Sequence, residues 1–177
     1  MRIFLIDNNS DVVDACEKAF AGMPDVSVIH GDIFEYAHNT IVSPANTLGV
    51  MDGGIDRLYR DYFGAALEEQ LMGYYSELQA EQGYVTAGQS VLLPTHNDSI
   101  PYLIASPTLV GAKDGATPQD VYYAMLGVLS VAHRHQEKVT DLFMPGLGTG
   151  VGMLAPELAA REMAQCLRDW RTRMPEI

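Results

Sequence analysis

Cations are scarce in this sequence of 177 residues, which has only three lysines and a formal net charge of −12. Proteins that bind DNA or RNA neutralise many phosphates with lysine and arginine side chains, so the composition argues against a nucleic-acid polymer as partner. A small anionic ligand stays compatible with this charge, because backbone N–H groups in a loop or at a helix N-terminus can hold a phosphate.

Long hydrophobic runs are missing as well. No apolar stretch approaches the roughly 18 residues that span a bilayer, so we expect no association with a membrane. Acidic residues directly follow the short apolar stretch at the N-terminus, which favours a first strand over a signal peptide. The two cysteines, Cys16 and Cys166, lie far apart in helix-like sequence and suit small core residues of a cytoplasmic protein.

Predicted strands and helices alternate along the chain. Strands are expected at residues 2–6, 26–29, 40–42, 90–93, 102–105 and 139–144. Helices are expected from about residue 10 to a stop at Gly22, and at 54–63, 65–82, 118–135 and 156–173. This pattern predicts one α/β domain over residues 1–177 with helices on both faces of its sheet. The fold that we expect is a three-layer α/β/α sandwich with a mixed sheet. The segment 110–117 is the most plausible mobile loop.

Two glycine-rich segments stand between a predicted strand and a predicted helix. The first glycine-rich loop is VSPANTLGVMDGGID, residues 42–56, and the second is MPGLGTGVGMLAP, residues 144–156. Glycine lets the backbone adopt positive φ and lets a ligand approach closely. In open α/β sheets such loops lie at the carboxyl edge of the strands, where ligands bind.

Each loop alone has a simpler explanation, because a glycine-rich turn can serve only to make a tight corner. No Gly-Lys-Ser/Thr follows the second loop, so it is not a P-loop. The turn after the first strand reads IDNNSD and lacks the GxGxxG of a dinucleotide fold. Two glycine-rich loops without a basic residue therefore favour a pyrophosphate held by backbone amide dipoles.

Three motifs occur in a fixed order: His30-Gly31-Asp32-Ile33, then VSPAN with GGID, then MPGLGTGVG. Together they resemble the signature of the macro domain family over about residues 28–173, and the first loop is similar to a bacterial and phage-associated branch. The resemblance implies a macro-domain fold that binds ADP-ribose, free or attached to a protein. We expect neither a cofactor nor a metal.

The resemblance also implies a role for each matching residue. Asp32 would accept a hydrogen bond from the adenine amino group, and the backbone of Ile33 would also meet adenine; the alternative for Asp32 is a loop cap. Asn46 matches an asparagine near the distal ribose. The remaining implied ligand-binding residues are Gly53 and Gly54 at that ribose and Gly148, Thr149, Gly150 and Val151 around the diphosphate.

Asp56 is the residue on which a catalytic function would depend. It lies ten positions after Asn46, as does the acid that hydrolytic macro domains use to position water near the distal ribose. An acid at a helix start also stabilises the helix by ~0.3–1 kcal/mol without any catalysis. Arg57 and Arg60 stand where hydrolytic relatives have a small residue and a histidine, and Gly152 replaces an aromatic that packs on the ribose. The first hypothesis is therefore binding alone, and the second is removal of ADP-ribose from acidic side chains, or hydrolysis of a related ester, with Asp56 positioning water and Asn46 beside it.

The sequence gives little support for a different function, a nucleophilic catalyst or a metal site. A third hypothesis is an unrelated nucleotide-binding scaffold or a phage structural component. Ser43, Ser106 and Cys166 lack the surroundings of a nucleophile. His133 and His135 would point about 200° apart on a helix, so they cannot share a metal. The expected partner is ADP-ribose or an ADP-ribosylated protein.

Overall fold

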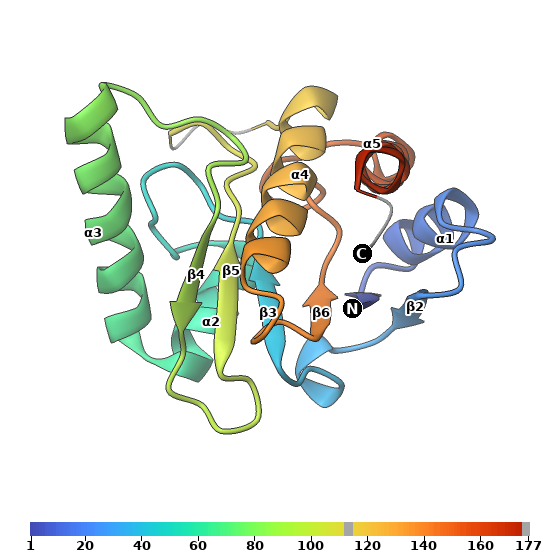
Figure 1. The fold of residues 1–177 in the computed structure, drawn as a ribbon, viewed down its shortest axis with the longest axis horizontal. Helices are drawn as coiled ribbons and strands as arrows, with labels where there is room; N and C mark the ends of the chain where they lie inside the picture. The colour runs from blue at the N-terminus through green and yellow to red at the C-terminus, as the bar shows by residue number, and fades with distance from the viewer. Residues whose placement is uncertain (112–114, 175–177) are drawn as a thin grey trace.

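The computed structural model describes residues 1–111 and 115–174 and contains one six-stranded sheet in the order β2-β1-β6-β3-β5-β4 (Figure 1). Every neighbouring pair runs parallel except β4 with β5, which is antiparallel. The predicted mixed sheet is thus confirmed. The strands are β1 (Arg2–Asp7), β2 (Val26–His30), β3 (Thr40–Ser43), β4 (Val91–Pro94), β5 (Tyr102–Ala105) and β6 (Asp141–Met144).

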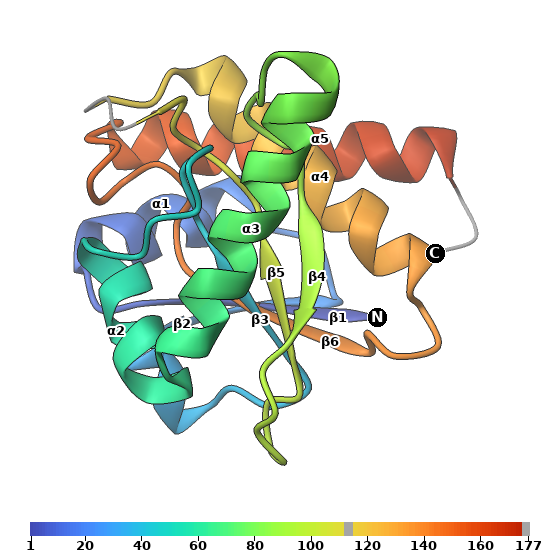
Figure 2. The same ribbon diagram turned by 90° about the vertical axis from the view of Figure 1, so that its left-hand side faces the viewer.

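Helices cover both faces of the sheet and form the outer layers of the predicted sandwich (Figures 1 and 2). One face is covered by α1 (Ser10–Ala19), α4 (Pro118–Arg134) and α5 (Pro156–Arg173), with α5 packed between the other two. The other face is covered by α2 (Gly54–Phe63) and α3 (Ala65–Gln82).

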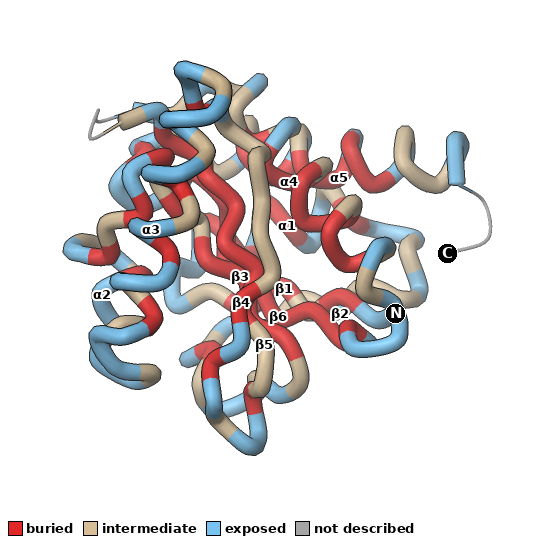
Figure 3. Tube along the Cα trace, turned by 60° about the vertical axis from the view of Figure 1, so that its left-hand side comes forward, coloured by how far each residue is buried: buried red, intermediate tan, exposed pale blue. Residues whose placement is uncertain are grey.

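Alternation along the strands divides the core between the two faces. Ile3 and Leu5 of β1 belong to the core under α1, α4 and α5, whereas Ile6 belongs to the core under α2 and α3. β6 alternates likewise, with Phe143 facing α2 and α3. Successive side chains of a strand point to opposite faces, so a strand between two helical layers is apolar throughout. Figure 3 shows the resulting buried centre.

Local capping explains where several helices begin. The Asn9 side chain accepts a hydrogen bond from Asp11 N and starts α1. Thr117 and Asp120 form a reciprocal capping box at α4, directly before Pro118. Pro156 starts α5, as the fixed φ of proline favours at a first helical position.

The predicted elements agree with the observed ones to within three residues at their ends, and the sequence missed one short 3₁₀ helix, η1 (Ile33–Glu35). In the predicted mobile loop 110–117, residues 112–114 lie outside the described residues. Both cysteines are buried as expected, and desolvation raises the pKa of each thiol to about 12. Over the described ranges no helix is long and apolar enough to cross a membrane, and no group of ligating side chains could hold a metal.

Candidate functional site

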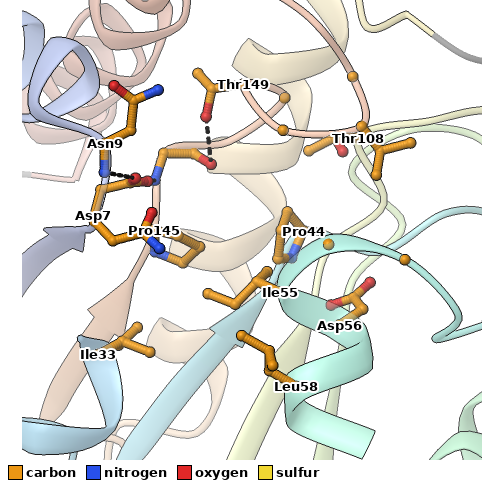
Figure 4. Close-up of a pocket in the computed structure, with 18 of the residues that line it drawn as sticks. Asp7, Asn9, Ile33, Pro44, Ile55, Asp56, Leu58, Thr108, Pro145 and Thr149 are labelled. Carbon is orange, nitrogen blue, oxygen red and sulfur yellow. Dashed lines mark hydrogen bonds between the residues drawn. The ribbon is translucent and has the colours of Figure 1, made fainter. Parts of the chain in front are cut away.

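A cavity of about 480 Å³ lies at the carboxyl ends of the parallel strands. Segments that follow β2, β1, β6, β3 and β5 line it, so the order of strands in the sheet sets the order of groups along the cavity. Figure 4 shows Asp7, Asn9 and Ile33 on one side, Pro145 and Thr149 between, and Asp56 and Thr108 on the other side.

The second glycine-rich loop, which links β6 to α5, forms the middle of the cavity. The N–H groups of Gly148, Thr149, Gly150 and Val151 donate to no acceptor among the described residues. Gly148 is buried, Thr149 is half-buried, and Gly150 and Val151 are exposed, so these successive N–H groups without a protein acceptor are available to an anionic ligand in the cavity. All four residues line the cavity.

Carbonyl groups of the same loop fix its shape. Leu154 N donates to Gly148 O at 2.9 Å, and Met153 N donates to Gly150 O at 3.0 Å. Gly148 has φ +73°, and a Cβ there would lie 2.8 Å from Val121, so both its backbone and its surroundings require glycine. A Cβ on Gly152 would lie 2.6 Å from Gly148 O, which leaves no room for an aromatic side chain in this loop conformation.

Asp7 at the end of β1 anchors the start of the second loop. Its Oδ2 accepts a hydrogen bond from Gly146 N at 3.1 Å, and its Oδ1 accepts one from Asn9 N at 2.9 Å. One carboxylate therefore holds the loop after β6 to the turn after β1, and both segments line the cavity.

Side chains hold the first glycine-rich loop, which links β3 to α2. The Asn46 amide donates to Val50 O at 2.9 Å and accepts from Leu48 N and Val50 N at 3.1 and 3.3 Å. Met51 N donates to Glu68 Oε2 of α3 at 2.6 Å. Asn46 therefore shapes the loop, and one N–H of its amide remains beyond these contacts.

Asp56 in the first turn of α2 is 7% exposed and lines the cavity. Ser43 Oγ donates to its Oδ1 at 2.6 Å from the end of β3. Desolvation is the main cause that raises the pKa of Asp56 to about 7; the charge of Asp52 also raises it, and the Ser43 hydrogen bond opposes both. Tyr59 Oη donates to Val42 O at 3.0 Å and so fixes α2, and Asp56 with it, against β3.

The two glycine-rich loops meet over the cavity. A Cβ on Gly53 or Gly54 would lie 3.6 or 3.5 Å from Val151 Cγ2. Gly54 also has φ +56°. A Cβ at either position would make an ordinary van der Waals contact with Val151, so the two loops lie within side-chain reach of each other, and only the positive φ of Gly54 specifically favours glycine.

At the β1–β2 end, the cavity is lined by Gly31, Asp32, Ile33 and Phe34. Asp32 Oδ1 accepts from Phe34 N at 2.9 Å and caps the 3₁₀ helix η1. The capping role considered as an alternative for Asp32 is therefore present in the structure, and it occupies Oδ1 alone. Ile33 is buried, and the Phe34 ring stacks on Tyr62 of α2 with a centroid distance of 4.3 Å.

Charge in the cavity has one sign. Its charged lining residues are Asp7, Asp32, Asp52 and Asp56, and no residue described as lining it is a lysine, arginine or histidine. A ligand with a diphosphate would therefore depend on backbone N–H groups, as the sequence predicted.

Comparison with known proteins decides the family, because the macro domain model matches residues 42–163. The chain belongs to the macro domain family. This macro domain is 28% identical over 152 residues to an Aquifex aeolicus protein, covering 86% of each chain. Among solved structures it resembles the macrodomain of Mycobacterium tuberculosis DarG, with a TM-score of 0.63, 21% identity, and 84% and 91% of the two chains covered. It also resembles Thermosipho africanus DarTG in complex with ADP-ribose, with a TM-score of 0.66, 15% identity, and 94% of this chain and 50% of that one covered.

The sequence located most of this macro domain's cavity. All the predicted site residues line it, from Asp32 and Ile33 at one end, through the second loop, to Asn46, Gly53, Gly54 and Asp56 at the other. Their roles toward a ligand remain predictions.

Sequence reasoning gave no role to Asp7, Asp52 or Thr108, which line the cavity, or to Ser43, which lies behind Asp56. Asp7 had a usable signal, because an acid at the end of a parallel strand lies at the ligand edge. Ser43 was considered only as a nucleophile, and its actual partner lies 13 residues away.

Proposed function

We propose that this macro domain binds ADP-ribose or an ADP-ribosyl group. The observation that carries the proposal is the run of N–H groups of residues 148–151, which have no described acceptor at the middle of the cavity. A diphosphate is a ligand that such a run would hold in a site without cations. The complex of Thermosipho africanus DarTG with ADP-ribose supports this choice of ligand.

The order of strands then orients the ligand. With the diphosphate at the second loop, adenine would lie toward β1 and β2, where the free oxygen of Asp32 can accept from its amino group. The apolar Ile33 and Phe34 would pack on the base. The distal ribose would lie toward β3, beside Asn46 and the Gly53–Gly54 backbone.

Hydrolysis is the second candidate function, and the buried Asp56 is the observation that favours it. A carboxylate with a pKa of about 7 at a cavity wall is suited to general base catalysis near neutral pH. Asp56 would take a proton from water while the water oxygen bonds to the anomeric carbon of the distal ribose. The bond from that carbon to the departing carboxylate oxygen would break, and the carboxylate would leave with the electron pair.

Calorimetry with ADP-ribose, AMP, ADP and NAD⁺ tests the binding function. We expect ADP-ribose to bind more tightly than AMP, because AMP has neither the second phosphate nor the distal ribose. Flat traces for all four compounds would contradict both candidate functions.

Release of ADP-ribose from a glutamate-modified protein separates the two candidates. If Asp56 activates water, Asp56→Ala should lose most of the wild-type rate and keep measurable affinity, because the base acts in the transition state. We expect weak or no release by the wild type, since Gly152 offers no ring to hold the distal ribose. Rapid release that disappears in Asp56→Ala would establish the enzyme.

A further inference from the structure

Two carboxylates lie at the β3–β5 end of the cavity. Asp52 is exposed and Asp56 is 7% exposed, and both line the cavity wall. Ser43 donates to Oδ1 of Asp56, whereas no described residue donates to its Oδ2. Oδ2 is not among the buried polar atoms that lack a partner, so it is accessible from the cavity and can accept a hydrogen bond or a charge contact from a ligand there.

The arginines on α2 leave this charge uncompensated. Arg60 Nε lies 3.4 Å from Glu68 Oε1, outside the cavity lining, and so pairs with α3. Arg57 is exposed, is not a lining residue, and forms no ion pair among the described residues. Asp52 and Asp56 therefore face the cavity with no cation beside them, and above about pH 7, where Asp56 is ionised, they repel each other as like charges.

The cavity consequently has a definite charge pattern along its length. Free N–H groups of the second loop lie in the middle, and the Asp52–Asp56 pair lies on the β3–β5 side. If the diphosphate lies on the second loop, a substituent on the distal ribose projects toward the two carboxylates.

We propose that the Asp52–Asp56 end of the cavity selects ADP-ribosyl compounds whose distal ribose carries a cationic group, such as a pyridinium or a guanidinium. This inference rests on the proposed function. A cation at this end of the cavity is attracted by both carboxylates and offsets their mutual repulsion, and it can contact the accessible Oδ2 of Asp56. A neutral substituent of the same size, including an ester, gains neither effect.

NAD⁺ and NADH provide the test, because they share the ADP-ribosyl part and differ in the ring on the distal ribose, which is a cation in NAD⁺ and neutral in NADH. We expect the wild type at low ionic strength to bind NAD⁺ about five- to tenfold more tightly than NADH, the effect of one charge pair a few ångströms apart near a surface. In Asp52→Asn, measured like the wild type at pH 8, this affinity ratio should fall to about two- to threefold, because removing one of two carboxylates removes about half of the free energy of attraction.

A matched control separates this local effect from the net charge of the protein. The charge of −12 favours the less anionic dinucleotide at any site. Asp61→Asn removes the same charge from an exposed position of α2 outside the cavity lining. The NAD⁺/NADH ratio should therefore remain at the wild-type value in Asp61→Asn.

Binding of ADP-ribose, measured alongside, distinguishes the possible failures. If ADP-ribose binds and the two dinucleotides bind equally, or neither binds, charge selection is wrong while the proposed function stands. An equal fall of the ratio in Asp52→Asn and Asp61→Asn would also overturn the selection, since it would show only net charge. Absence of ADP-ribose binding would overturn both proposals.

Discussion

Side chains accept several N–H groups along the first glycine-rich loop, whereas a side chain, Asp7, accepts an N–H group of the second loop only at its start, and the loop's own carbonyl groups accept the N–H groups farther on. Asn46 and Glu68 accept the N–H groups of Leu48, Val50 and Met51 in the first loop. In the second loop the acceptors are Asp7 Oδ2 at its start and Gly148 O and Gly150 O farther on, and the N–H groups of residues 148–151 remain without a described acceptor.

Because of this difference, the two loops contribute different chemical groups to a ligand. Much of the first loop's backbone is already bonded, so its contribution to a ligand comes from side chains, chiefly Asp52 and Asp56. The second loop has no charged side chain and contributes free N–H groups. Substitutions in the first loop should therefore change specificity and pH dependence, and substitutions in the second should change affinity.

The largest effect is expected from Gly150→Glu. A Cβ at Gly150 meets nothing within 4 Å, so the variant should fold, while its carboxylate would lie beside the free N–H groups and repel a diphosphate. We expect a loss of ADP-ribose affinity of at least about 100-fold by calorimetry, as a charge-assisted contact of ~1.5–3 kcal/mol is replaced by repulsion. Gly150→Gln matches the size without the charge and should keep measurable binding. Equal affinities for Gly150→Glu and the wild type would place the diphosphate elsewhere.

Asp32, which lies outside both loops, tests whether the β1–β2 end contributes independently. Asp32→Ala should weaken ADP-ribose binding by about 10- to 100-fold, the value of a charge-assisted hydrogen bond of ~1.5–3 kcal/mol. Asp32→Asn retains an oxygen for the cap on Phe34 N and removes only the charge, so its thermal stability should stay closer to that of the wild type. If both variants bind like the wild type, the assignment of adenine to this end is wrong.

The smallest expected effect is on the stability of the folded protein, and it concerns Asp56, the buried carboxylate at the end of the first loop. The pKa of Asp56 in the folded state is about 7, above its unfolded value near 3.8, so the folded state holds the proton more tightly. This group's contribution to stability is therefore full below about pH 4 and is lost as the pH rises through about 7. Asp56→Asn should be more stable than the wild type by about 1–3 kcal/mol at pH 8 and nearly equal to it at pH 4.

Denaturant unfolding of both proteins at pH 4, 6 and 8 measures this difference. The amide oxygen that Asp56→Asn introduces can still accept the hydrogen bond from Ser43, so packing changes little. A stability difference that does not vary with pH would show that Asp56 is not the titrating group.

Periodicity and turn chemistry were sufficient to predict the order of strands and helices, because central strands such as β3 and β6 are buried throughout and helix caps such as Asn9 and Thr117 are local signals. The glycine motifs were sufficient to locate the cavity. What the sequence could not provide is pairing across the fold: Gly146 N donates to Asp7 over 139 positions, and Glu68 of α3 accepts from Met51 N in the first loop. Such contacts follow from the order of strands and the packing of α3, and no spacing rule encodes them.

Backbone amide shifts measured by NMR during titration with ADP-ribose test the division between the loops most directly. We expect the largest changes at the N–H groups of Gly148, Thr149, Gly150 and Val151, with smaller changes at Leu48, Val50 and Met51, whose N–H groups are already bonded. Saturating binding that leaves residues 148–151 unchanged would contradict the claim that free amides of the second loop hold the diphosphate.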